Sequence, residues 1–253
     1  MGTSKSRTAK GRKRQVVSSD ASLVLLFTCE HGGHDIPATY RKFFRGATKV
    51  LKSHRGWDPG ALELAERFAA RCHAPLYSST VSRLLVELNR SLHHRSLFSE
   101  YTRDLTPPEQ TTIVQTYYLP HREAVERQIR DFVAAGRRVL HVGVHSFTPE
   151  LNGVVRQADI GLLYDPQRAW EQSFCTAWRS ALRKHSPELR VRKNYPYLGT
   201  SDGFTTYLRT RFANSQYAGV ELEMNQRFAL GAPQLWETVQ ETLVATMLEA
   251  VVL

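Results

Sequence analysis

Short runs of apolar residues alternate along the chain with longer segments in which apolar residues recur every three or four positions. Short apolar runs bounded by glycine, proline or polar residues are typical of buried strands, and the longer spacing is typical of amphipathic helices. We therefore predict strands over residues 22–28, 74–79, 83–88, 138–144, 159–164 and 217–224. We predict helices from Asp58-Pro59-Gly60 onward and over residues 106–135, 167–185 and 233–252, the second interrupted at Pro120.

Strands that alternate with helices of this length indicate βαβ units and a mainly parallel sheet. Asp58 followed by Pro59 has the composition of a helix N-cap and first turn, so capping is the simplest role for Asp58. The sequence has no internal repeat and no evident linker. We therefore expect residues 20–253 to form a single α/β domain.

Length and composition agree with a globular protein. The 253 residues are 42% hydrophobic and 23% charged, and a chain of this length buries a large core without disulfides. The longest apolar run, residues 23–27, is far shorter than the roughly 20 residues of a membrane span, so we expect no membrane partner. Three widely spaced cysteines without a CxxC pair indicate reduced thiols and a cytoplasmic location.

The net charge of +10 is concentrated at the N-terminus. Residues 1–14 carry six basic side chains and no acidic one, which leaves +4 for the other 239 residues. We expect residues 1–19 to be a disordered basic tail whose contact with nucleic acid is non-specific. A nucleic-acid-binding or anion-binding module is the non-enzymatic alternative. Removing residues 1–15 distinguishes an enzyme from a binding module. An enzyme would keep its turnover, whereas a nucleic-acid-binding module would lose affinity and show a weaker dependence on salt.

Polar and titratable residues follow the ends of several predicted strands, where sites form in open α/β sheets. They are Glu30, His31 and His34 after the first strand, Asn89 and Arg90 after the third, His145 and Ser146 after the fourth, and Glu221 and Glu223 in the last.

Two histidines and a carboxylate form a common ligand set for catalytic zinc. His31 and His145 are the candidate imidazole ligands. Spacing alone leaves the third ligand open among Glu30, His34 and Asp58.

Further candidate groups are a general base and cationic substrate contacts. Glu221 and Glu223 lie two residues apart on one strand and so face the same side, where either is a candidate general base. Arg83, Arg90 and Arg156 are candidates to bind an anionic substrate, because guanidinium groups bind carboxylates in a bidentate manner.

Several segments together resemble the N-formylglutamate amidohydrolase family, which is related to zinc carboxypeptidases and aspartoacylases. The resemblance extends over about residues 23–230 in the same order. Its segments are Thr28-Cys-Glu-His-Gly-Gly-His-Asp-Ile-Pro37, His54-Arg-Gly-Trp-Asp-Pro-Gly-Ala61, Ser82-Arg-Leu-Leu-Val-Glu-Leu-Asn-Arg90, Val144-His-Ser-Phe-Thr-Pro149, Ala158-Asp-Ile-Gly-Leu-Leu-Tyr-Asp165, Asn194-Tyr-Pro-Tyr197 and Gly219-Val-Glu-Leu-Glu-Met-Asn-Gln226.

The resemblance implies a three-layer, zinc-carboxypeptidase-like α/β fold whose central sheet is mainly parallel or mixed. It implies one zinc ion per chain, held by His31, Asp58 and His145, and a small anionic N-acyl amino acid as substrate. His34 departs from the family pattern, which has asparagine there, and an extra imidazole at this position could rearrange the ligands.

The resemblance also implies roles for the other candidates. Glu223 would be the general base, and Arg90 would stabilise the oxyanion together with Asn89. Arg83, Arg156 and Ser146 would add substrate contacts. The expected reaction converts N-formyl-L-glutamate and water to glutamate and formate. The alternatives are an amidase or carboxypeptidase acting on a peptide or cell-wall fragment, and a non-catalytic relative. The oligomeric state is left open.

Overall fold

A six-stranded sheet with the strand order β2-β1-β3-β8-β6-β7 forms the centre of the computed structural model, which describes residues 23–252. Its strands are β1 (Leu23–Cys29), β2 (Leu76–Ser78), β3 (Arg138–Phe147), β6 (Ile160–Leu163), β7 (Val191–Lys193) and β8 (Tyr217–Asn225). All neighbours are parallel except β6 and β8, which are antiparallel. A separate hairpin consists of β4 (Glu150–Leu151) and β5 (Val154–Val155). The predicted α/β fold with a mainly parallel or mixed sheet is confirmed.

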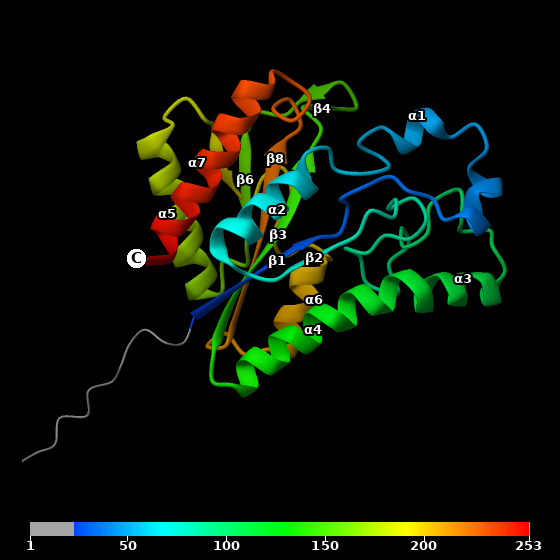
Figure 1. Cartoon of the computed structure of the whole chain (residues 1–253), viewed down its shortest axis with the longest axis horizontal. Helices are drawn as coiled ribbons and strands as arrows, with labels where there is room; N and C mark the ends of the chain where they lie inside the picture. Colours follow the sequence, from blue (N-terminus) through cyan, green and yellow to red (C-terminus); the bar gives the residue numbers. More distant parts are fainter. Residues whose placement is uncertain (1–22, 253) are drawn as a thin grey trace, which may run out of the picture.

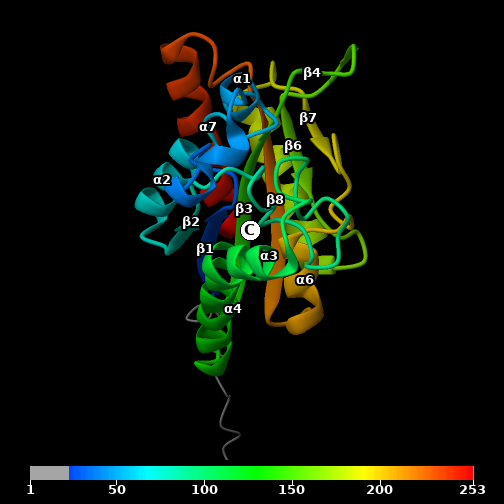
Figure 2. The ribbon, with the colours of Figure 1, turned by 90° about the vertical axis from the view of Figure 1, so that its right-hand side faces the viewer.

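Helices cover both faces of the sheet and complete three layers (Figures 1 and 2). One face carries α2 (Ala61–Cys72), α5 (Ala169–His185) and α7 (Pro233–Val252), and the other carries α4 (Leu119–Ala134) and α6 (Phe204–Arg211). Because side chains alternate along β1, Phe27 packs in the core beneath α2, α5 and α7, and Leu26 packs in the core beneath α4 and α6.

A third apolar cluster lies beside the sheet, on the right of Figure 1. It includes the 3-10 helix Ala38–Phe44 and the loop that contains Leu84, Leu85 and Val86. The remaining helices of this side are α1 (Thr48–Leu51), α3 (Pro107–Ile113) and a π-helical turn at Val114–Tyr118 that joins α3 to α4. The predicted interruption of the 106–135 helix is therefore present, just ahead of Pro120.

Two local predictions are wrong. Residues 83–88 form turns and not a strand, because their apolar side chains pack into the cluster beside the sheet while Leu85 N donates to Ser82 O. Asp58 is not the cap of α2. Gly60, with a φ of 80°, precedes the first helical residue, and the Asp58 carboxylate points to other side chains.

Within residues 23–252, no helix combines the length and the apolar character needed to cross a membrane. The predicted disordered tail, residues 1–19, lies outside the described residues.

Candidate active site

Eight of the nine residues to which the resemblance assigned a role line one cavity of about 150 Å³. The cavity lies where the carboxyl ends of β1, β3 and β8 meet, which is the expected edge of a parallel sheet. The eight are His31, Asp58, Arg83, Asn89, Arg90, His145, Ser146 and Glu223, and the other lining residues are Tyr197, Leu198, Ser201, Asp202 and Glu221.

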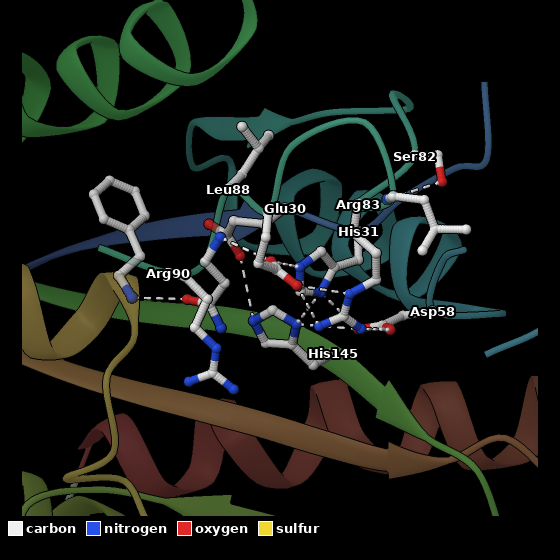
Figure 3. Close-up of polar contacts among 12 residues, drawn as sticks. Glu30, His31, Asp58, Ser82, Arg83, Leu88, Arg90 and His145 are labelled. Carbon is white, nitrogen blue, oxygen red and sulfur yellow. Dashed lines mark hydrogen bonds and ion pairs between the residues drawn. The ribbon is translucent and has the colours of Figure 1, made fainter. Parts of the chain in front are cut away.

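Three buried side chains at this edge form a compact group that could hold a metal ion, as Figure 3 shows. His31 Nδ1 lies 3.2 Å from Asp58 Oδ2, His145 Nδ1 lies 3.1 Å from the same oxygen, and the two nitrogens are 3.2 Å apart. Zinc with bonds of about 2.0–2.1 Å to N and O places tetrahedral ligands about 3.3 Å apart. The donor types and their separations therefore fit zinc.

Each histidine of this group has a carboxylate behind it. His31 Nε2 donates to Glu87 Oε1, and His145 Nε2 lies 3.3 Å from Glu30 Oε2. A proton held on each Nε2 leaves the Nδ1 lone pair free toward the centre of the group. Burial alone would raise the pKa of Glu30, but His121 and His145 outweigh burial and hold that pKa well below its ordinary value. Glu30 is therefore an anion that orients imidazoles.

Arg83 connects two of these carboxylates. Its Nη1 donates to Asp58 Oδ1 at 3.1 Å, and its Nε donates to Glu87 Oε2 at 2.8 Å. Arg83 borders the cavity, as the substrate-contact prediction required, but its guanidinium is already paired with both acids. The position fits a brace for Asp58 better than a free anion-binding group.

The alternative third ligands lie outside the metal group. Glu30 lies behind His145, as described above. The His34 ring packs edge-to-face on Trp57, with 5.4 Å between ring centroids. The ligand set implied by the resemblance is thus the one that the fold brings together.

Glu223 has the environment of a group that exchanges protons. It pairs with His145 in the register of β8 and β3, its side chain is buried, and Oε2 has no hydrogen-bond partner among the described residues. Burial raises the pKa of Glu223 to about 8, opposed by the charges of His145 and Arg83 and assisted by those of Asp58 and Glu221. Glu221, by contrast, accepts a hydrogen bond from Thr205 Oγ1 at 3.1 Å.

The remaining predicted substrate contacts, Asn89, Arg90 and Ser146, each make a hydrogen bond within the protein. Asn89 Oδ1 accepts from Phe204 N at 2.7 Å and Arg90 Nη1 donates to Asp202 O, so both side chains are oriented at the cavity wall. The Ser146 hydroxyl donates to Pro59 O at 2.9 Å and so braces the turn after Asp58.

Arg156 is the ninth candidate and is not among the lining residues. Its Nη2 donates to Tyr197 Oη at 3.0 Å, while its buried Nη1 has no partner within the described part of the chain. Tyr197 itself does line the cavity.

Sequence reasoning assigned no role to Glu87 or His121. Glu87 lies in the segment Ser82–Arg90, two residues before Asn89, so the sequence already indicated a carboxylate close to the candidate site. His121 approaches Glu30 from α4, with Nε2 3.4 Å from Oε1, and no sequence pattern marks this contact.

Two solved structures resemble this one along most of its length. A crystal structure of a gene product from Agrobacterium tumefaciens superposes with a TM-score of 0.77 at 29% identity, covering 90% of each chain. That of N-formylglutamate amidohydrolase from Ralstonia eutropha superposes with a TM-score of 0.65 at 17% identity, covering 90% of this chain and 92% of the other, which supports the fold. No curated protein matches the sequence significantly.

The sequence of residues 23–230 matches the family model of N-formylglutamate amidohydrolase. This range includes every lining residue of the cavity. The chain therefore belongs to the N-formylglutamate amidohydrolase family.

Proposed function

We propose that this protein is a zinc-dependent hydrolase that cleaves the amide of an N-formyl or N-acyl acidic amino acid. Its expected reaction converts N-formyl-L-glutamate and water to glutamate and formate. One zinc ion per chain would be held by His31, Asp58 and His145. The observation that carries the proposal is the buried carboxyl group of Glu223, whose Oε2 has no hydrogen-bond partner among the described residues, beside a possible three-ligand group at the same cavity.

When bound, zinc would polarise the carbonyl oxygen of the scissile amide and lower the pKa of water. Glu223 acts as the general base and removes a proton from the attacking water. The water oxygen forms a bond to the formyl carbon, and Glu223 passes the proton to the amide nitrogen as the C–N bond breaks. Between the two steps the carboxyl group holds the proton, and burial, which raises its pKa, favours this protonated form.

Asn89 and Arg90 act on the substrate from the wall of the same cavity. The Arg90 guanidinium supplies positive charge to the developing oxyanion or to a substrate carboxylate. Asn89 Oδ1 accepts a hydrogen bond from Phe204 N and Arg90 Nη1 donates one to Asp202 O, so both side chains are fixed before the substrate binds. Pre-orientation of this kind reduces the entropic cost of reaching the transition state.

The proposal is tested by metal content and turnover together. Elemental mass spectrometry of the purified protein should give close to one zinc per chain, and formate release should follow addition of N-formyl-L-glutamate. His145→Ala should lose both. His185→Ala is the matched control, because His185 is exposed and pairs with Glu249.

Other outcomes separate the alternatives. Zinc without formate release, but with cleavage of a peptide or cell-wall amide, would replace the substrate assignment. Absence of metal, with none taken up on reconstitution, would make a non-catalytic relative the better hypothesis.

A further inference from the structure

A buried arginine on α4 contacts the backbone of the segment that carries Asn89 and Arg90. Arg122 Nη1 donates to Leu88 O at 2.9 Å and reaches Arg90 O at 3.4 Å. Tyr118 Oη donates to Arg90 O at 2.7 Å. The carbonyl groups on both sides of Asn89 are therefore held by two side chains, Tyr118 at the end of the π-helical turn and Arg122 on α4.

Arg122 is held without an acidic partner. None of the ion pairs found among residues 23–252 includes it, and burial lowers its pKa. Its guanidinium carbon lies 5.0, 4.3 and 4.7 Å from the ring centroids of Tyr118, Phe204 and Tyr207. Burying a cation without a counter-ion is costly unless its donors find acceptors, and cation–π contacts offset only part of that cost. The carbonyls of Leu88 and Arg90, together with the more distant charges of Glu30 and Asp202, thus compensate for the burial of Arg122.

The π-helical turn before α4 helps to explain this arrangement. Residues 114–118 insert a wider turn between α3 and α4, which changes the direction of the side chains that follow. Tyr118 and Arg122 are four residues apart and share one face of the helix. His121, between them, reaches Glu30. The start of α4 therefore contacts the candidate site at two separate points.

We propose that Arg122, assisted by Tyr118, is a positioning residue that holds the Leu88–Arg90 backbone, so that Asn89 and Arg90 meet the substrate already oriented. This role rests on the proposed function for its kinetic consequence. Arg122 itself is not among the lining residues of the cavity.

The test compares Arg122→Met with Arg168→Met. Arg168 is an equally buried arginine that donates to the carbonyls of Arg209, Phe212 and Tyr217, away from the cavity. The first readout is amide hydrogen exchange at residues 89–91. These amides donate to Glu87 Oε1, Glu87 O and Asp202 Oδ2 in the folded protein. The second readout is steady-state kinetics on N-formyl-L-glutamate.

We expect Arg122→Met to speed exchange at residues 89–91 at least tenfold and to lower kcat/KM by about 10- to 100-fold, with bound zinc unchanged. Arg168→Met should change neither readout in its folded fraction. Arg122→Lys and Tyr118→Phe should give intermediate effects, and they carry the test if Arg122→Met does not fold.

Unchanged exchange at residues 89–91 in the folded Arg122 variants would overturn the positioning role, whatever the substrate. If the wild-type protein fails to release formate while the variants still loosen residues 89–91, the proposed function fails and the backbone role stands. A loss of thermal stability alone, equal in the Arg122 and Arg168 variants, would reduce Arg122 to a packing residue.

Discussion

Glu223 on β8 lies directly opposite His145 on β3 in the parallel register of the two strands. On its other side, Glu223 faces Gly161 of β6. The backbone of three strands therefore fixes the candidate base relative to a candidate metal ligand, without any contribution from a mobile loop. Because the backbone fixes this geometry, single substitutions at the site have specific expected effects.

Glu223→Gln keeps the size of the side chain and removes its ability to accept a proton. We expect kcat to fall by about 10²- to 10⁴-fold, the usual range for loss of a general base, while zinc content stays at the wild-type level. Glu221→Gln is the control, because Glu221 faces the same cavity but accepts a hydrogen bond from Thr205. A near-normal kcat for Glu223→Gln, or a larger loss for Glu221→Gln, would refute the assignment of the base.

Glu87→Gln tests the carboxylate behind His31. The amide can still accept from His31 Nε2, but it carries no charge for the imidazole or for Arg83. We expect zinc affinity to fall by about 10- to 100-fold, measured by competition with a chelator. Glu63→Gln is the control, since Glu63 accepts from Trp236 and Gln240 in another part of the molecule. Equal affinities in the two variants would contradict this role.

His141 predicts a loss of stability at mildly acidic pH. It is fully buried between Thr28 Oγ1 and Tyr217 Oη, and burial lowers its pKa to about 4. As the pH falls from about 6.5 to 4, the unfolded chain takes up a proton at this histidine but the folded chain does not, so the free energy of unfolding decreases. The decrease between pH 7 and 5 should be about 2 kcal/mol.

Denaturant unfolding of the wild type and of His141→Gln at both pH values measures this contribution. The wild type should lose about 2 kcal/mol more than the variant, because the other titrating groups are common to both. Equal losses would show that His141 titrates in the folded protein as it does in the unfolded chain.

Gly161→Ala should disturb the wall of the cavity. A Cβ at this position would lie 2.1 Å from Tyr195 O and 3.2 Å from Glu223 Cβ, so backbone must move. We expect a loss of about 1–3 kcal/mol in the free energy of unfolding and reduced turnover. Gly143→Ala is the control for stability, because its Cβ would meet only ordinary contacts at 3.5 Å or more. Equal stabilities of the two variants would contradict the predicted steric clash.

The sequence by itself determined the elements with strong periodicity and the residues at the ends of strands. The strands around Leu26, Val142 and Val220 and the long helices follow from short-range apolar patterns, which local physics dictates. His31 and His145 could be selected because apolar strands end in few polar groups and parallel strands bring those ends together. The resemblance then singled out Asp58.

Only the tertiary structure decided what each polar side chain contacts. Leu84 and Val86 have the composition of a strand, but a cluster beside the sheet buries them without strand pairing, so burial alone did not specify the local conformation. The contacts of Glu87 with His31, of Arg83 with Asp58 and of Arg122 with Leu88 O join residues far apart in sequence. Their directions depend on how helices and loops pack. No local pattern encodes that packing, because it is the whole fold that brings these groups together.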